Sequence, residues 1–214
     1  TLMEATRYAV SNNQEDLNRV QVPVDEYLSI LSVGGDSLYD DPVTAPDFEV
    51  LVNHLMAHYP YVVIDLSAAP SHLARTTLLR ANEIFVVATP TLPSLRQART
   101  LIKEIDDLRS GEHDGAVKFI LNAQGQDKAS EVSASDIETA LETKIDLNIA
   151  YDPKLYRATE SQGKNLKDAK GTEKLTNSLS ALLQDILDKD DKASAGKSKS
   201  DSSLVGGLLN KVKG

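Results

Sequence analysis

The chain has 214 residues, of which 41% are hydrophobic, and it contains no cysteine. This length suits one domain with a sizeable core, and the missing cysteines exclude a disulfide framework and a cysteine metal site. The net charge of the chain is −9. Residues from Asp188 onward contain six lysines and four aspartates, a net charge of +2, so the residues before Asp188 carry a net charge of −11. An acidic body repels the phosphate backbone, so we expect no nucleic-acid partner.

The first third of the chain predicts helices more clearly than strands. Residues 2–10 have the pattern of a short helix, and the polar stretch 11–19 that follows is predicted to be a loop. Residues 27–33 alternate in hydrophobicity and end at two glycines, which predicts a strand running into a turn. Residues 46–59 predict a helix with one apolar face: Phe48, Leu51, Val52, Leu55 and Tyr59.

Residues 59–94 predict a strand, a helix and a second strand. Residues 61–64 (YVVI) and 84–88 (IFVVA) are continuous apolar runs that suit strands buried on both faces. Pro70 and Ser71 begin the helix between them, and Asn82 ends it. The two strands of such a βαβ unit are parallel, and ligands bind at the carboxyl ends of the strands, where Asp65 and Thr89 lie.

The remainder continues the alternation of helices and strands. Ser94 is predicted to cap a helix that ends at Leu108, and residues 116–121 predict a third strand that is followed by Asn122. Ser135 and Glu138 have capping-box spacing and are predicted to begin a short helix that runs through Leu141. The other expected elements are a half-exposed edge strand at 145–151, a helix that begins at Asp152-Pro153 and ends near Gly163, and a last helix through residues 175–186.

Domain boundaries follow the composition. Residues 1–187 are predicted to form one α/β domain, a parallel sheet flanked by helices, and residues 188–203 are too polar to offset their ordering entropy and are expected to be disordered. Residues 204–214 are amphipathic and are expected to contact a membrane surface or a groove, with an unstructured end as the equal alternative. The apolar residues of that segment are Leu204, Val205, Leu208, Leu209 and Val212.

Asp65 and Asn122 are the candidate ligand-binding residues. A carboxylate at the end of a buried strand can hold Mg²⁺ beside nucleotide phosphates, or it can cap its own loop. The amide of Asn122 can present a donor and an acceptor to a purine edge, or it can brace its own loop. No GxxxxGK[ST] motif occurs in the 214 residues, so this sequence contains no phosphate-binding loop and lacks the equipment for ATP hydrolysis.

Two further sets of side chains each have a functional and a structural interpretation. His54 and His58 have metal-ligand spacing on a helix, but with no third ligand nearby a solvated pair is favoured. Arg96, Arg99 and Lys103 line one side of a helix and suit an acidic partner or DNA, but acidic residues follow closely, so the default is a solvated face.

With these residues in place, the sequence resembles MinD/ParA-type deviant-Walker ATPases, and most closely the CpaE/TadZ-type proteins of tight-adherence (Flp) pilus assembly. The resemblance covers roughly residues 28–186, and the run VATPTLPSLRQAR followed by YDPKLYRATESQGK is fairly specific to the pilus group. The segments that carry it, in order, are YVVIDLSAAPS, RANEIFVVATPTLPSLRQAR, FILNAQ and IAYDPKLYRATESQGKNL.

The resemblance implies roles for four residues. Asp65 corresponds to the Walker B acid and metal-binding residue, Asn122 to the base-contacting asparagine, and Asp152 and Pro153 to the loop that closes over the base. The phosphate-loop strand, which is central to the family's sheet, would precede Thr1, so we expect a truncated P-loop NTPase core. The sequence departs from the family at 67–69, where a glycine that senses the γ-phosphate is frequent, and at Ala150, where proline is frequent.

The resemblance further implies ATP and Mg²⁺ as cofactors, a homodimer, and contact with the pilus secretion machinery at the inner face of the cytoplasmic membrane or at a cell pole. Its nucleotide would act as a dimerisation switch more than as fuel. The alternatives are a nucleotide-free scaffold of the same fold and a ParA-like partition ATPase.

Overall fold

The computed structural model describes residues 1–32, 43–67, 69–109, 117–163, 165–184 and 187. The chain divides into two compact units, Thr1–Asn82 and Glu83–Gly214, which we describe separately. Several predicted features fall outside the described residues: the turn at Gly34-Gly35, residue 116 of the predicted third strand, residues 185–186 of the predicted last helix, and everything from Asp188 onward.

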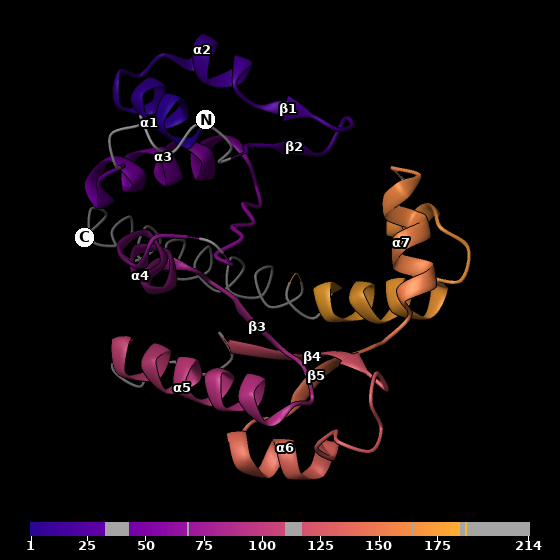
Figure 1. Cartoon of the computed structure of the whole chain (residues 1–214). Coiled ribbons are helices and arrows are strands. Elements are labelled where there is room, and N and C mark those ends of the chain that lie inside the picture. The colour runs from indigo at the N-terminus through magenta and orange to yellow at the C-terminus, as the bar shows by residue number, and fades with distance from the viewer. Residues whose placement is uncertain (33–42, 68, 110–116, 164, 185–186, 188–214) are drawn as a thin grey trace, which may run out of the picture. The chain divides into compact units, whose positions relative to one another are not determined.

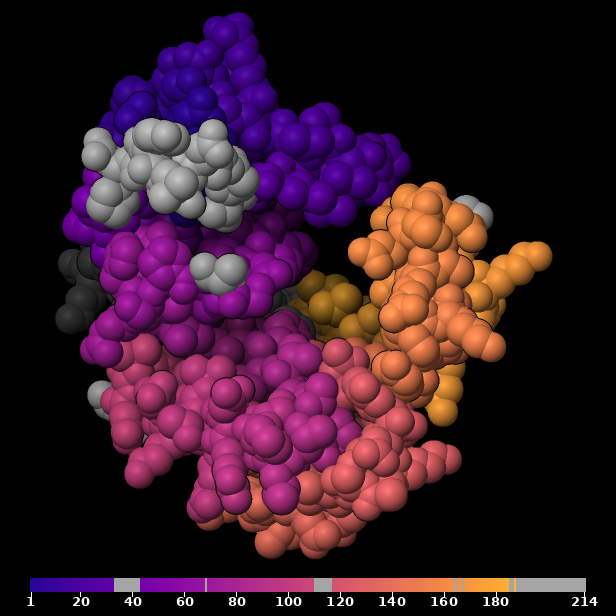
Figure 2. Space-filling model, in the orientation of Figure 1, coloured from indigo at the N-terminus to yellow at the C-terminus, as the bar shows by residue number. Residues whose placement is uncertain are grey.

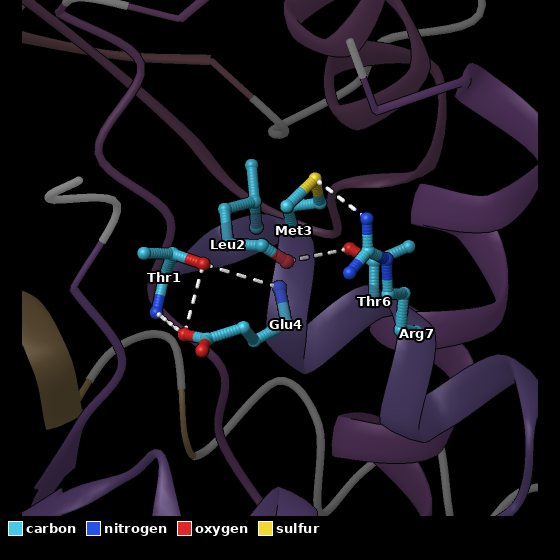
Figure 3. A network of polar contacts seen from close by, with 6 residues as sticks. All are labelled: Thr1, Leu2, Met3, Glu4, Thr6 and Arg7. Atoms are coloured by element: carbon cyan, nitrogen blue, oxygen red, sulfur yellow. Dashed lines mark hydrogen bonds and ion pairs between the residues drawn. The ribbon is translucent and has the colours of Figure 1, made fainter. Parts of the chain in front are cut away.

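The first unit is mainly helical. It contains α1 (Leu2–Val10), α2 (Gln14–Arg19), a short hairpin of β1 (Val22–Pro23) and β2 (Ser29–Ile30), α3 (Ala45–His58) and α4 (Ser71–Arg80) (Figure 1). The helix at 2–10 is confirmed, and it begins with a capping box. The Thr1 hydroxyl accepts the Glu4 N–H at 3.2 Å, while the Glu4 carboxylate accepts from the Thr1 amino group at 2.7 Å (Figure 3).

The predicted loop at 11–19 was wrong, because most of it forms α2. The Asn13 side chain accepts the Asp16 N–H and caps this helix, and Leu17 is fully buried. A single apolar residue in a polar stretch does not signal a helix in the sequence. The core around it combines α1, α2 and α3 and is built from Ala5, Ala9, Leu17 and Leu51.

α3 has the predicted apolar face, with Phe48, Leu51 and Val52 buried. The hairpin confirms only part of the predicted strand at 27–33, since the ladder joins Val22 to Ile30 and Pro23 to Ser29. It projects from the helices of this unit (Figures 1 and 2) and exposes Tyr27 by 87%.

The predicted buried strand at 61–64 was wrong. No strand is assigned there, and Tyr61 and Val63 are 62% and 95% exposed. Ile64 does pack against the core of Phe48, Val52 and Leu73. β-Branched residues favour extended backbone, but a strand also requires a hydrogen-bonded neighbour, and the described residues provide none for this segment.

The second unit contains a three-stranded parallel sheet in the order β3-β4-β5, so the predicted parallel α/β fold is confirmed. Its elements are β3 (Ile84–Ala88), α5 (Leu92–Leu108), β4 (Val117–Gln124), α6 (Ala134–Leu141), β5 (Ile145–Ala150), α7 (Pro153–Ser161), a 3₁₀ turn (Leu166–Asp168) and helical residues 173–184. Helices α5 and α6 lie along one face of the sheet (Figure 1). The residues buried in this unit include Val86, Ile105, Phe119, Leu121, Ile137 and Leu147.

Three expectations for this unit need correction. β3 is buried on one face only, because Phe85 and Val87 are 41% and 56% exposed. α5 begins at Leu92, and Ser94 accepts the Thr89 N–H at 3.0 Å instead of capping the helix. α6 is capped by Ser133, two residues before the predicted Ser135, because the Ser133 hydroxyl accepts the Asp136 N–H.

Candidate functional site

The carboxyl end of β4 carries Asn122, whose side chain is exposed. Its Oδ1 accepts the N–H of Ala123 at 2.8 Å. Ala123 has a φ of 58°, in the left-handed region that an alanine enters at a cost of roughly 1–2 kcal/mol. Such backbone strain concentrates at ligand-binding sites, and here it directly follows the candidate base-contacting residue.

The loop after Asn122 is held by Glu131. The Glu131 carboxylate accepts the Gly125 N–H at 2.9 and 3.0 Å and the Asp127 N–H at 3.1 Å. Gly125 has a φ of 90°, a conformation that a side chain would strain. Glu131 and Ala123 were not singled out from the sequence, where only the glycine within a polar stretch signals the turn.

Asp152 and Pro153 follow β5, the neighbouring parallel strand. The predicted helix start is confirmed, because the Asp152 side chain accepts the Leu155 N–H at 3.0 Å and Pro153 occupies the first turn. The Tyr151 N–H donates to the Gln124 carbonyl at 2.9 Å, which ties this turn to the end of β4. The structure therefore brings Asn122 and Asp152 to the same edge of the sheet.

Tyr156 lies one turn into α7. Burial, followed by the negative charge of Asp152, raises the pKa of the Tyr156 phenol above its ordinary value. The phenol therefore stays protonated at neutral pH and keeps its hydrogen-bond donor. No sequence pattern distinguished this tyrosine.

Asp65 belongs to the first unit and is described apart from these residues. The Asp65 Oδ1 accepts the Ser67 N–H at 2.9 Å. Asp65 therefore caps its own loop, which is the structural role predicted as the alternative to Mg²⁺ binding. Hydrogen bonds from Ser67, the backbone one first, lower the pKa of the Asp65 carboxyl below its usual value. Asp65 is therefore ionised at neutral pH, the form in which a carboxylate binds a cation, and its side chain is exposed.

The described residues contain no group of three or more His, Asp or Glu that could hold a metal ion. His54 and His58 stack with ring centroids 4.4 Å apart, and the His58 Nδ1 lies 2.7 Å from the His54 carbonyl oxygen. His54 contacts Gln14 of α2 through its Nε2. This pair fits a packing role between two helices.

The hollows found among the described residues lie elsewhere. One of 440 Å³ runs along α6 to the beginning of β5 and is lined by residues such as Ser135, Glu138 and Lys144. None of the candidate site residues lines it. Among the described residues, no helix has both the length and the apolar character that crossing a membrane requires.

Comparisons with known proteins point to one kind of fold. No protein-family model matches this chain. The septum site-determining protein MinD of Thermotoga maritima is 28% identical over 80 residues, which are 37% of this chain and 29% of that protein. The match thus spans less than a third of this relative's length.

Solved structures match over most of the chain. A ParA family ATPase from Chlorobium tepidum superposes with a TM-score of 0.70 at 18% identity, covering 85% of this chain and 74% of that one. The cell division ATPase MinD of Pyrococcus furiosus gives 0.62 at 21% identity, covering 85% and 76%. At these identities the likeness concerns architecture. The chain therefore has the α/β fold of MinD/ParA-type ATPases, with a parallel sheet flanked by helices.

Proposed function

We propose that the chain belongs to a MinD/ParA-like nucleotide-dependent switch that acts in Flp pilus assembly. One observation carries the nucleotide part of the proposal: Asn122 in the last residues of β4 and Asp152 just after the parallel strand β5 lie at one sheet edge, where the Tyr151 N–H donates to the Gln124 carbonyl. Ligands bind at such an edge in parallel sheets. The pilus role rests on the resemblance of VATPTLPSLRQAR and YDPKLYRATESQGK.

In this proposal Asp65 binds Mg²⁺ together with the nucleotide phosphates. Mg²⁺ in nucleotide sites takes one or two carboxylates and completes its shell with phosphate oxygens and water, so a single ionised aspartate fits the ion. The phosphates need a cradle from outside these 214 residues, since no glycine-lysine phosphate loop occurs within them.

Equilibrium binding of labelled ATP to the full-length protein tests the proposal. We expect Asp65→Ala to weaken Mg-ATP binding and Asn122→Ala to weaken ATP binding by about fivefold relative to a pyrimidine triphosphate, since one lost hydrogen bond is worth about 1 kcal/mol. Glu49→Ala removes an exposed carboxylate from α3 and is the matched control. Failure of all of these proteins to bind ATP would favour the nucleotide-free scaffold.

A ParA-like partition ATPase is the second candidate, favoured by the superposition on the Chlorobium tepidum protein. It predicts salt-dependent binding to nonspecific DNA in the presence of ATP. The net charge of −11 before Asp188 opposes that binding, so we expect no DNA binding at about 150 mM salt, where the Debye length is about 8 Å. A steep salt dependence with long duplex DNA would instead support partition.

The proposal extends to a homodimer and to the C-terminal residues. We expect ATP to shift the full-length protein from monomer to dimer, as measured by light scattering. We further propose that residues 188–203 link the domain to an amphipathic segment at 204–214 that contacts the membrane or the pilus machinery. Deleting Ser203–Gly214 should reduce sedimentation with vesicles or with that partner while leaving the thermal midpoint unchanged. An unchanged sedimentation profile would contradict this.

A further inference from the structure

Glu131 closes the loop that joins β4 to α6 (Figure 1). Its half-buried carboxylate accepts the Gly125 N–H with both oxygens, at 2.9 and 3.0 Å, and the Asp127 N–H at 3.1 Å. Charge-assisted hydrogen bonds of this kind are shorter and stronger than neutral ones. The side chain of Glu131 therefore joins the end of the loop to its beginning.

Both ends of this loop are also tied to the neighbouring strands of the sheet. The Tyr151 N–H, just after β5, donates to the Gln124 carbonyl at 2.9 Å. The Val132 N–H, next to Glu131, donates at 3.0 Å to the carbonyl of Pro90, which follows β3. Glu131 therefore acts from a backbone position that is fixed relative to the carboxyl ends of β3, β4 and β5.

The loop sets the backbone on which Asn122 presents its amide. The Asn122 Oδ1 accepts the Ala123 N–H at 2.8 Å, and Ala123 has a φ of 58°. Gly125, whose N–H Glu131 accepts, has a φ of 90°. Two left-handed residues within three positions require contacts that hold them, because an alanine prefers the right-handed region. Glu131 supplies one such contact, and the Gln126 N–H supplies another by donating to the Ala123 carbonyl at 3.3 Å.

The Asn122 side chain retains a hydrogen-bond donor for a ligand. Its Oδ1 accepts the Ala123 N–H, and within the described residues its Nδ2 donates to no atom. The side chain is exposed at the carboxyl end of β4, the edge at which ligands bind to parallel sheets. Hydrogen bonds weaken steeply when the donor is misaligned, so this amide recognises a base only while its backbone keeps its direction.

A stabilising role of Glu131 can be separated from a role in recognition. Glu138 provides the comparison, because it is also half-buried and its Oε1 accepts the Ile145 N–H at 3.0 Å. That bond lies at the amino end of β5, whereas Asn122 lies at the carboxyl end of β4. Both carboxylates accept a backbone N–H, but only Glu131 does so in the loop that continues from Asn122.

We propose that Glu131 is a positioning residue that sets the base selectivity of the nucleotide site by holding the loop that orients Asn122. The inference rests on the proposed function, in which Asn122 contacts a purine edge. Glu131 itself touches no part of the nucleotide. Its removal should lower the preference for ATP over CTP and leave the affinity for inorganic triphosphate unchanged, because the proposed phosphate cradle lies outside these 214 residues.

Equilibrium binding of labelled ATP and CTP to the full-length protein measures this preference as the ratio of the two dissociation constants. Glu131→Ala should lower the preference by about threefold, a large part of the loss expected for Asn122→Ala. The double variant Asn122→Ala/Glu131→Ala should lose about fivefold, no more than Asn122→Ala alone, because two residues that act through one contact are not additive.

Glu138→Ala is the matched control and should keep the preference of the parent, although it too loses a bond to a backbone N–H. Glu131→Gln keeps a carbonyl oxygen that can accept the Gly125 N–H, so it should recover most of the preference. In the protein without nucleotide, Glu131→Ala should accelerate amide hydrogen exchange at Gly125 and Asp127, and Glu138→Ala should leave it unchanged there.

Three binding results would overturn the inference and leave the proposed function intact: an unchanged preference in Glu131→Ala, an equal loss in Glu138→Ala, or additive losses in the double variant. Unchanged exchange at Gly125 and Asp127 in Glu131→Ala would also overturn it, since other contacts would then hold the loop. Failure of the parent protein to bind ATP would instead overturn the proposed function, and the inference with it.

Discussion

The left-handed backbone conformation of Ala123 could not be predicted from the surrounding sequence. Its φ of 58° opposes the preference of alanine, so Ala123→Gly should leave the free energy of unfolding unchanged or raise it by up to about 1 kcal/mol. The control Ala140→Gly, on the exposed face of α6, should lower it by about 1 kcal/mol. Urea unfolding measures both, and equal losses would contradict a strained conformation at position 123.

His54 should make the stability of the first unit depend on pH. Burial, and then the charge of His58, lower the pKa of the His54 imidazole below its ordinary value of about 6.5. Below that value the unfolded chain binds a proton that the folded chain binds only at lower pH. Stability is therefore complete above about pH 6.5 and falls as the pH drops through and below it.

The measurement is the thermal midpoint of the chain between pH 8 and pH 5. His54→Gln should flatten its decline at acid pH, while retaining an amide that can contact Gln14. His72→Gln is the control, since His72 lies on α4 and contacts the Val43 carbonyl. If His54→Gln and the parent chain decline in parallel, another group is responsible.

At the scale of elements, the side chain of Asp146 in β5 contributes a hydrogen bond to the pairing of β5 with β4. Phe119 pairs with Ile145 and Ile120 with Leu147, so Asp146 is the extra residue of a β-bulge. Its carboxylate accepts the Phe119 N–H at 2.8 Å and lies 3.4 Å from the Lys118 Nζ. A side-chain oxygen thus replaces the backbone acceptor that the bulge removes from the ladder.

Asp146→Ala should therefore lower the free energy of unfolding by about 1–3 kcal/mol, the cost of a buried donor without its acceptor. Asp146→Asn keeps a carbonyl oxygen for the Phe119 N–H and should cost clearly less. Urea titration followed by circular dichroism compares the two variants. Equal losses would indicate that the charge on Lys118, and not the N–H acceptor, determines the contribution of Asp146.

For the whole molecule, the division at Asn82 and Glu83 predicts that core mutations act locally. Leu17 and Ile137 are 0% and 1% exposed in different units, and truncation of either to alanine should cost about 2–5 kcal/mol. In hydrogen exchange, Leu17→Ala should accelerate amides in 1–82 and Ile137→Ala those in 83–184. Acceleration of both units by either variant would show that the chain opens as one cooperative body.

The sequence by itself determined the elements whose signals are local. The parallel sheet of the second unit was predictable because continuous apolar runs at 84–88 and 116–121 alternate with amphipathic helices, and the start of α7 followed from Asp152-Pro153. The run at 116–121 also predicted Asn122 at the carboxyl end of its strand, the edge at which ligands bind to parallel sheets. Hydrophobic period and cap chemistry depend on neighbours along the chain.

The tertiary structure alone decided the features that depend on distant partners. Residues 61–64 have strong β-propensity, yet they form no strand because a ladder needs a second segment at the right distance. α2 forms in a polar stretch because Leu17 packs against buried residues of α1 and α3. At the bulge, the Asp146 side chain accepts the Phe119 N–H from the neighbouring strand. Burial and hydrogen-bond satisfaction belong to pairs of segments, and a single segment's sequence does not encode its partner.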